Sequence, residues 1–281
     1  MGYIAVVGAL NIDIIGTAFD EPLPGDSSPG LVRVTAGGVG RNIARTLIRL
    51  GDEVELIAPV AGGTDGAFAR ADCERLGIRL SGALEAAESC RYLCVNGPEG
   101  SLRLAVNDMA AMAHLTPEAI DRRKALLGGA EAIVLDANLT EEALTHLARS
   151  AARPLVADPV SAPKAARLKA ALSFLTAIKP NRTEAAALTG LPADSAPEAL
   201  ARALLDLGVR HVYLSLGEEG LLYAGRAEHF REPSRAVRAV NFNGCGDAAT
   251  AAVAHGIARG LMPRAIAALA MREAAAQALE P

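Results

Sequence analysis

The sequence predicts an α/β protein with a mostly parallel central sheet between two layers of helices and a small β-strand lid. Patterns typical of buried strands alternate with helical patterns along most of the chain, which indicates βαβ units. Two segments, 12–36 and 89–108, break this alternation with short strands of their own, and we assign them to the lid. The chain has 281 residues, 51% of them hydrophobic, so we expect one domain over residues 1–281 with a substantial core.

The first half of the chain opens with a strand. Residues 3–10, YIAVVGAL, form a continuous apolar run, as expected of a strand buried on both faces of a parallel sheet. Apolar spacing then predicts a helix at 42–51, a strand at 53–61 and a helix at 66–77. In the second lid segment, Gly97-Pro98 marks the turn of a hairpin.

The second half continues the alternation more regularly. Apolar runs predict strands at 131–137, 154–159, 175–181 and 209–217. Helical spacing predicts helices at 140–151, 162–175, 182–190 and 196–208. Thr140 stands where a helix N-cap belongs, and an alanine-rich helix begins abruptly near Asp247.

Composition excludes several classes of partner. The net charge is -4, aromatic residues make up 3% and Trp is absent, so we expect no nucleic-acid partner. No uninterrupted apolar run is long enough for a membrane span, and the N-terminus has no basic leader. The cysteines form no C-x-x-C pair, which favours a reduced, cytoplasmic protein. We therefore expect a small-molecule ligand.

The segment Gly244-Cys245-Gly246-Asp247 is the first candidate site. Amides of a glycine-rich turn at a helix start, together with the helix dipole, form an anion-binding site, and phosphate is the commonest anion of that shape. Asp247 is then placed to take a proton from a hydroxyl that attacks phosphorus. The alternative is that Asp247 only caps the helix and the glycines form a tight turn.

The segment AGGVGRN, residues 36–42, is the second candidate. Gly37 and Gly38 would let a sugar-like ligand approach the backbone, and Asn42 would bond to its hydroxyls. The alternative is a plain strand-to-helix turn. The spacing is not G-x-G-x-x-G, so a dinucleotide site is disfavoured.

The segment KPNRTE, residues 179–184, is the third candidate. Asn181 and Glu184 lie three residues apart at a helix start and so face nearly the same side. A carboxylate there can hold Mg²⁺ through water, which Mg²⁺ prefers. The alternative is a capping box, in which each side chain bonds to the other residue's backbone amide.

Two weaker candidates remain. In LSLGEEG, residues 214–220, Gly217 and Gly220 leave room for a nucleotide beside the strand end, although a hairpin turn explains the same residues. Polar residues also border the lid, and a carboxylate such as Asp13 is suited to grip two hydroxyls. These residues are Asn11, Asp13, Asn107 and Asp108, and solvated loop polarity is the alternative for them. We likewise expect Lys164 to be only a surface residue of a helix.

Taken in order, an early GG…N, a middle N-x-x-E and a late G-x-G-D resemble the PfkB/ribokinase family of carbohydrate and nucleoside kinases over nearly the whole chain. Residues 26–51, 105–118, 157–168 and 177–190 resemble the subgroup of that family that acts on pseudouridine. The resemblance implies a ribokinase-like α/β/α fold and transfer of phosphate from ATP, with Mg²⁺, to the nucleoside 5′-hydroxyl. It also implies activation by a monovalent cation such as K⁺, and homodimers that pair through the lid.

The resemblance also implies roles for individual residues. Asp247 would be the base, and the amides of Gly244, Cys245 and Gly246 would hold the γ-phosphate. The acceptor would contact Asn11, Asp13, Gly37, Gly38, Asn42, Asn107 and Met109. The phosphates, Mg²⁺ and ATP would contact Asn181, Glu184, Ser215, Gly217, Gly220 and Asn243.

The chain departs from the family pattern at three positions and at its end. Asn243 and Cys245 replace the usual Thr and Ala, and Ala249 replaces a common aromatic residue. The chain also ends at Pro281, soon after the helix that begins near Asp247, which leads us to expect weaker nucleotide binding. Two alternatives stay open: another sugar or nucleoside kinase of the family, or a pseudokinase that binds its ligand without turnover.

Overall fold

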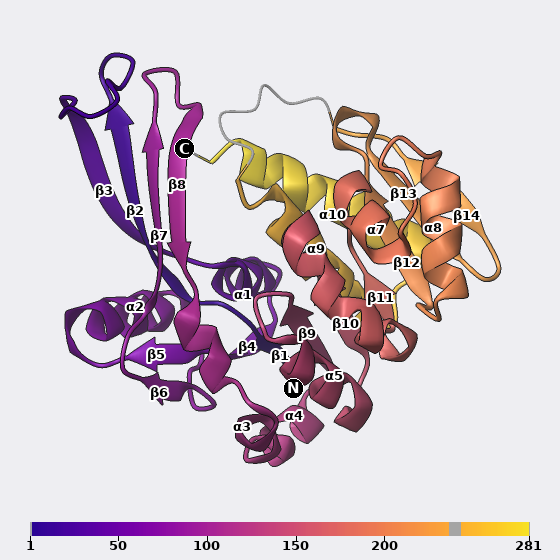
Figure 1. The fold of residues 1–281 in the computed structure, drawn as a ribbon. Helices are drawn as coiled ribbons and strands as arrows, with labels where there is room; N and C mark the ends of the chain where they lie inside the picture. Colours follow the sequence, from indigo (N-terminus) through magenta and orange to yellow (C-terminus); the bar gives the residue numbers. More distant parts are fainter. Residues whose placement is uncertain (1, 236–242, 281) are drawn as a thin grey trace.

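The fold is described from a computed structural model, which describes residues 2–235 and 243–280 (Figure 1). The main sheet has the strand order β14-β13-β12-β11-β10-β9-β1-β4. The strands are β1 (Tyr3–Val7), β4 (Glu53–Ile57), β9 (Ala132–Asp136), β10 (Leu155–Asp158), β11 (Ala177–Ile178), β12 (His211–Ser215), β13 (Leu221–Gly225) and β14 (His229–Glu232). From β4 to β12 neighbouring strands are parallel, and β13 and β14 add to the edge antiparallel. The predicted fold class is confirmed.

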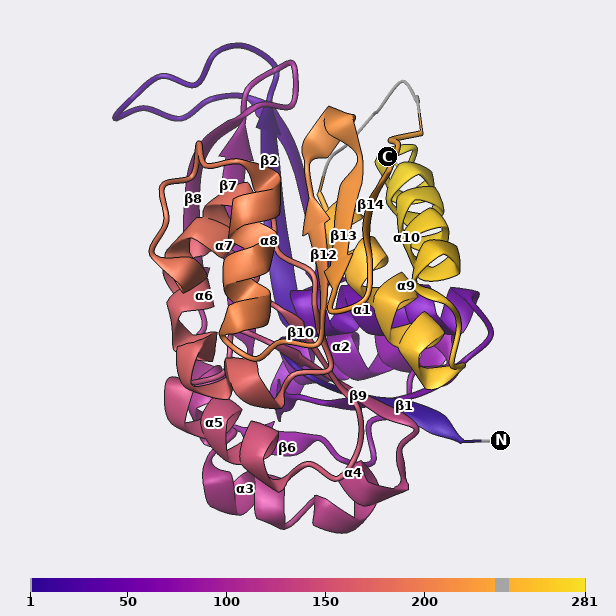
Figure 2. The ribbon, with the colours of Figure 1, turned by 90° about the vertical axis from the view of Figure 1, so that its right-hand side faces the viewer.

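Helices cover both faces of this sheet (Figure 2). One layer contains α1 (Val39–Arg49), α2 (Gly63–Leu76), α9 (Cys245–Ala258) and α10 (Pro263–Ala278). The other contains α3 (Pro117–Asp121), α4 (Lys124–Gly129), α5 (Glu141–Ser150), α6 (Ala162–Ala165), α7 (Arg182–Thr189) and α8 (Pro197–Asp206). Alternate residues of β1 point into the two layers: Ile4 and Val6 lie in one core and Ala5 and Val7 in the other.

A separate sheet of order β3-β2-β7-β8 rises from the body as the lid (Figure 1). Its strands are β2 (Asn11–Ala18), β3 (Gly30–Gly37), β7 (Cys90–Asn96) and β8 (Leu102–Asp108). They fall within, or one residue outside, the two segments that the sequence assigned to the lid. β7 and β8 form the predicted hairpin, and the lid meets the body where β3 ends and α1 begins.

Two predicted strands differ in extent. The strand predicted at 53–61 is divided, because β4 pairs in the main sheet while β5 (Pro59–Ala61) pairs with β6 (Leu84–Ala86) in a small sheet of their own. The strand predicted at 175–181 shortens to β11, since Pro180 has no amide hydrogen for a ladder bond.

The helix predicted at 162–175 is α6 followed by a 3₁₀ helix, η2 (Ala166–Phe174). The buried face of this segment consists of Ala165, Leu168, Ala171 and Leu172. Further 3₁₀ turns are η1 (Ala110–His114) and η3 (Gly217–Glu219). No helix within residues 2–235 and 243–280 combines the length and apolar character needed to cross a bilayer.

Candidate active site

A glycine turn forms the start of α9. Gly244 precedes the helix with φ 77°, a left-handed conformation that glycine adopts without strain. The first amides of a helix have no partner within the helix, which is why a helix start is suited to binding an anion. Asp247 is the third residue of α9 and lies within its first turn, while Gly244 occupies the N-cap position. The role of Asp247 as a base therefore stays a prediction, beside the alternative in which it only stabilises the helix start.

The carboxylate of Asp247 is instead held by a residue from α1. Asn42 Nδ2 donates to Asp247 Oδ2 at 2.9 Å, and helices α1 and α9 pack against each other. Burial raises the pKa of Asp247 to about 7, with repulsion from Asp158 adding to the rise, while the Asn42 hydrogen bond and Lys179 oppose it. A carboxylate that titrates near neutral pH is well matched to general base catalysis.

Lys179 and Asp158 are further charged residues around Asp247. The sequence patterns did not single them out as site residues. Lys179 Nζ lies 3.7 Å from Asp158 Oδ2, and a Cβ built on Gly246 would lie 3.0 Å from that same Nζ. Burial opposes the charge on Lys179, but the carboxylates of Asp158, Glu184 and Asp247 outweigh it and raise the pKa of Lys179. A buried ammonium ion therefore stands beside the glycine turn.

Asp158 is itself fixed by two further donors. Thr250 Oγ1 donates to Asp158 Oδ2 at 2.5 Å, and the Val160 amide donates to Oδ1 at 2.8 Å. Asp136, at the end of the neighbouring strand β9, accepts from the Ala9 amide at 2.8 Å, and burial raises its pKa to about 6. One signal for these residues was in the sequence: they end parallel strands, where sheets of this class bind ligands.

At the foot of the lid, two buried acceptors lack donors. Asn11 Oδ1 and Asp13 Oδ1 have no hydrogen-bond partner among the described residues. A Cβ on Gly37 would lie 1.8 Å from Asp13 Oδ2, so only glycine leaves room for that carboxylate. Burial raises the pKa of Asp13 to about 6, opposed by Arg41. Unpaired acceptors here suit a ligand that carries hydroxyl groups.

Gly38 joins this site to Asn42. It is the N-cap of α1 with φ 94°, and a Cβ there would lie 2.6 Å from the Ala9 carbonyl oxygen. The close approach lets α1 start directly after β3, which places Asn42 in the first turn, against Asp247. The segment predicted to bind the acceptor and the segment predicted to bind phosphate therefore meet through the hydrogen bond between Asn42 and Asp247.

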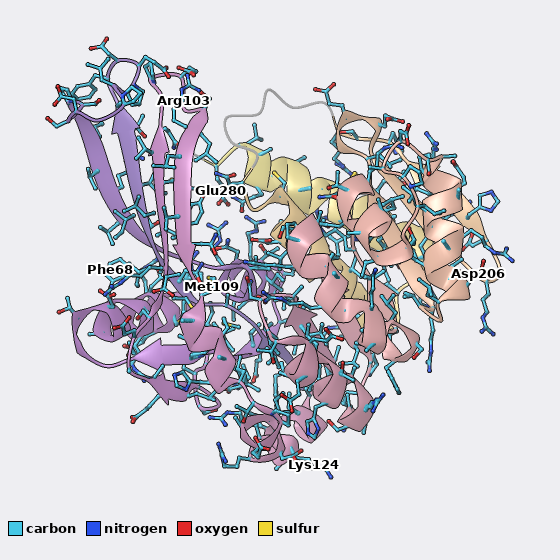
Figure 3. The ribbon with its side chains drawn as sticks, viewed as in Figure 1. Phe68, Arg103, Met109, Lys124, Asp206 and Glu280 are labelled. Carbon is cyan, nitrogen blue, oxygen red and sulfur yellow. The ribbon has the colours of Figure 1, made fainter. Side chains whose placement is uncertain are left out.

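Asn107 shares a face of the lid with Asp13. Asp13 pairs with Tyr92, and Tyr92 pairs with Asn107, so the three form one row across adjacent strands. Residues opposite each other in a sheet point to the same side. Asn107 is exposed on that side, and Met109 lies at the base of β8, partly buried (Figure 3).

Asn181 and Glu184 form the predicted capping box. Glu184 Oε2 accepts from the Asn181 amide at 2.9 Å, and the Glu184 amide donates to Asn181 Oδ1 at 2.9 Å. The second carboxylate oxygen of Glu184 accepts from Asn181 Nδ2 at 2.9 Å. Glu184 therefore offers no oxygen without a partner for direct metal coordination, and burial raises its pKa against the pull of Lys179.

Ser215, Gly217 and Gly220 lie at the end of β12, next to Asn181. Ser215 forms a bridge with Asn181, and its amide donates to the Pro180 carbonyl oxygen at 2.8 Å. Gly217 and Gly220 form the turn between antiparallel strands β12 and β13, with φ 63° and 93°. The hairpin turn offered as the alternative is thus present, and a nucleotide role for these glycines stays a prediction.

Lys164 is not the surface residue that we expected. Its Nζ donates to Asn138 Oδ1 at 2.6 Å, and Asn138 is buried. Burial lowers the pKa of Lys164, opposed by Asp136.

The residues are also suited to a magnesium ion held through water rather than directly. Within residues 2–235 and 243–280, no three His, Cys, Asp or Glu side chains gather as a metal site. Mg²⁺ commonly keeps several waters and binds through substrate phosphates. Asp158, Glu184 and Asp247 are the carboxylates around Lys179, and Glu184 is the one that the sequence predicts such waters would contact.

Comparison with known proteins shows which family the sequence matches. The model of the pfkB family of carbohydrate kinases matches residues 1–281. Pseudouridine kinase of Escherichia coli (strain K12) is 31% identical over 259 residues, which are 90% of this chain and 82% of that protein. Guanosine-inosine kinase of Exiguobacterium acetylicum is 30% identical over 264 residues, 90% of this chain and 86% of that protein.

The fold is also that of a solved ribokinase. The crystal structure of ribokinase from Thermotoga maritima superposes with a TM-score of 0.89 at 24% identity, covering 100% of this chain and 94% of that one. The family resemblance seen in the sequence is confirmed.

Proposed function

This chain belongs to the pfkB family of carbohydrate kinases, and we propose that it transfers the γ-phosphate of ATP to the 5′-hydroxyl of pseudouridine. The observation that carries the proposal is the meeting of three features at one point. A carboxylate that titrates near neutral pH, the start of a helix at a glycine turn and a buried ammonium ion lie together at Asp247, Gly246 and Lys179.

In this proposal Asp247 accepts the proton of the 5′-hydroxyl as that oxygen approaches the γ-phosphorus. The amides of Gly244, Cys245 and Gly246 and the charge of Lys179 stabilise the negative charge on the phosphoryl oxygens. Asn42 orients Asp247 through its hydrogen bond. Mg²⁺, when bound, neutralises phosphate charge, and Asn181 and Glu184 order its waters.

The acceptor lies at the foot of the lid. Asn11 and Asp13 supply acceptors for the ribose hydroxyls, Gly37 and Gly38 leave space for the ring, and Asn107 and Met109 face the base. A neutral nucleoside is favoured over a sugar phosphate, because the lid strands carry no cluster of unpaired cations. Arg91 and Arg103 are paired with Asp65, Glu21 and Glu99, which leaves Arg33 as the remaining arginine of these strands. ATP contacts Ser215, Gly217, Gly220 and Asn243. A monovalent cation such as K⁺ activates the enzyme. The protein works in the cytoplasm.

Pseudouridine is preferred because four segments of the sequence resemble the kinases that use it, and two relatives, from Escherichia coli and Arabidopsis thaliana, bear that name. A relative named for guanosine and inosine is almost as similar. ADP release should therefore be measured with pseudouridine, uridine, guanosine, inosine and ribose, with ATP and Mg²⁺. A kcat/KM highest for pseudouridine is expected, and a higher value for any other acceptor refutes the substrate. Binding of pseudouridine without ADP release would identify a pseudokinase.

The lid also supports a homodimer. The face opposite Asp13 carries apolar side chains that are 41% to 72% exposed: Val32, Val34, Leu93, Leu104 and Val106. They form two rows across the strands, Val34-Ile14-Leu93-Val106 and Val32-Gly16-Val95-Leu104. An exposed apolar face of this kind is unfavourable in water and is typical of an interaction surface. A second copy of this chain would cover it.

Light scattering on the Val34→Lys and Leu104→Lys variants tests this proposal. The unmodified chain should have the mass of a dimer and the variants that of a monomer. A monomeric unmodified chain would refute the dimer without touching the proposed reaction.

A further inference from the structure

A cavity lies at the end of the molecule away from the glycine turn. It is bounded by α3, α4, α5 and the first residues of β9 and has a volume of about 150 Å³. Strand β9 passes from Ile133 at the cavity to Asp136 beside the active site. Lys124, which borders the cavity, lies at the opposite end of the molecule from the lid residue Arg103 (Figure 3).

The walls of the cavity are apolar and buried. Ile120, Leu127, Ile133 and Leu147 line it, and each is at most 6% exposed. A cavity of about 150 Å³ lined by such side chains can stay dry and take up a molecule the size of benzene. One ring or a short branched chain therefore fits the space.

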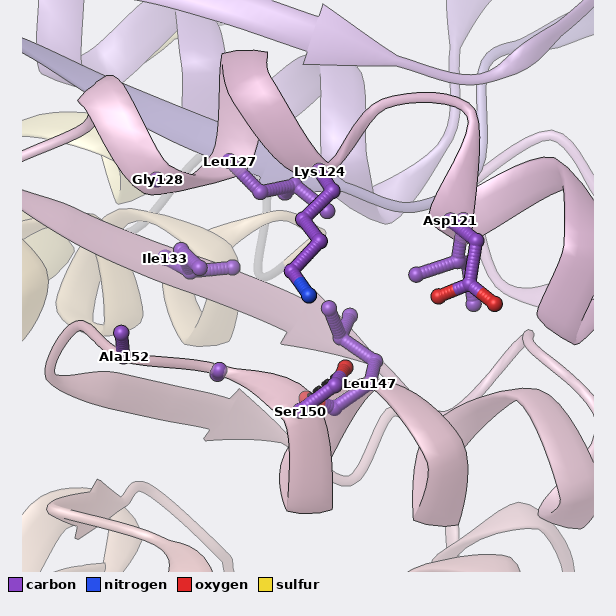
Figure 4. A pocket seen from close by; sticks show the side chains of 10 residues that line it. Asp121, Lys124, Leu127, Gly128, Ile133, Leu147, Ser150 and Ala152 are labelled. Carbon is purple, nitrogen blue, oxygen red and sulfur yellow. Dashed lines mark hydrogen bonds between the residues drawn. The ribbon is translucent and has the colours of Figure 1, made fainter.

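The mouth of the cavity carries polar groups, and all but one have partners. Asp121 pairs with His146 at 2.8 Å, Ser150 Oγ donates to a carbonyl oxygen at 3.3 Å, and the Gly128 carbonyl oxygen accepts from Arg153 at 2.8 Å. Lys124 has no hydrogen bond or ion pair within the described residues. Its side chain reaches from α4 across the mouth toward α5 (Figure 4).

We propose that this cavity binds a small monocarboxylate whose single ring or short branched chain fills the apolar walls. The carboxylate pairs with Lys124, the cation at the mouth that lacks an internal partner. A neutral ligand of the same shape would leave this charge unmatched, and a larger ring system would exceed the volume. The site is separate from the one proposed for the kinase reaction, since it lies beyond the other end of β9.

Calorimetry with benzoate on the full chain tests the proposal. Saturable binding with one site and a Kd on the order of 0.1 to 1 mM is expected for a ligand of this size. Lys124→Met should weaken binding about fivefold, as for a partly exposed ion pair with a hydrogen bond. Ser150→Leu, which fills the cavity from its rim, should abolish binding.

Lys169→Met is the matched control, because Lys169 is an exposed lysine on η2 outside the cavity lining. It should bind benzoate like the unmodified chain, and circular dichroism should show all variants folded. Absence of saturable binding up to 20-fold above the expected Kd, about 20 mM, overturns the site. Binding that survives Ser150→Leu, or that Lys124→Met and Lys169→Met weaken equally, overturns the assignment to this cavity and this cation. Benzyl alcohol bound as tightly as benzoate overturns the carboxylate.

Discussion

The substitution Asp247→Asn should abolish most turnover and at the same time stabilise the fold. The amide cannot accept a proton, so we expect kcat to fall by a factor on the order of 10² to 10⁴, the usual contribution of general base catalysis. The amide oxygen can still accept the hydrogen bond from Asn42. The geometry of α1 and α9 is therefore kept while the charge is removed.

The gain in stability follows from the sign of the pKa shift. The pKa of Asp247 rises from 3.8 to about 7 on folding, so the folded protein binds this proton more tightly than the unfolded chain. Stability is then lost as pH rises from about 4 to about 7 and stays lower above that. At about 1.4 kcal/mol for each pKa unit, the ionised carboxylate costs at most about 4 kcal/mol.

The loss of the anion reduces this gain in the variant. An anion in the first turn of a helix contributes roughly 0.3 to 1 kcal/mol that the amide gives up. We therefore expect a net gain of about 1 to 3 kcal/mol at pH 8, which raises Tm by a few degrees in a chain of this size.

Thermal unfolding at pH 5 and pH 8, with ADP release measured in parallel, tests both parts. The difference in Tm between variant and parent should be larger at pH 8. An unchanged or lower Tm at pH 8 would refute the desolvated environment of Asp247. Turnover that persists in the variant would refute its role as the base.

Three further predictions concern the neighbours of Asp247. Asn42→Ala removes a hydrogen bond that favours the ionised carboxylate of Asp247. The acid limb of the profile of kcat/KM against pH, expected near pH 7, should therefore move to higher pH. A profile that stays in place would contradict a role of this hydrogen bond in setting the pKa. Glu184→Gln keeps a side chain suited to the capping box, so Tm should change little. The Mg²⁺ concentration that gives the half-maximal rate should rise about tenfold. An unchanged Mg²⁺ requirement would leave Glu184 with the capping role alone. Lys179→Met leaves the Asp158 carboxylate buried without its cation. Urea titration should show that the free energy of unfolding falls by about 3 kcal/mol, and kcat should fall at least tenfold. A stable, active variant would exclude Lys179 from the site.

The fold class could be predicted because its signals are local. Apolar runs, helical spacing and glycine stops report secondary structure within a few residues of each position. The limits of the elements were harder to predict. The division of 53–61 into β4 and β5 depends on which strand each half pairs with, and the 3₁₀ form of η2 depends on what packs against it.

The sequence alone determined which residue types stand in order along the chain: paired glycines before Asn42, the capping box at Asn181, and a glycine turn before Asp247. Only the tertiary structure decided what those residues do to one another. Asn42 and Asp247 are 205 residues apart yet share a hydrogen bond, and Lys179 reaches the glycine turn from the residue that follows β11. The charge state of a carboxylate depends on its desolvation and on charges within a few ångströms, and chain folding alone brings those groups together.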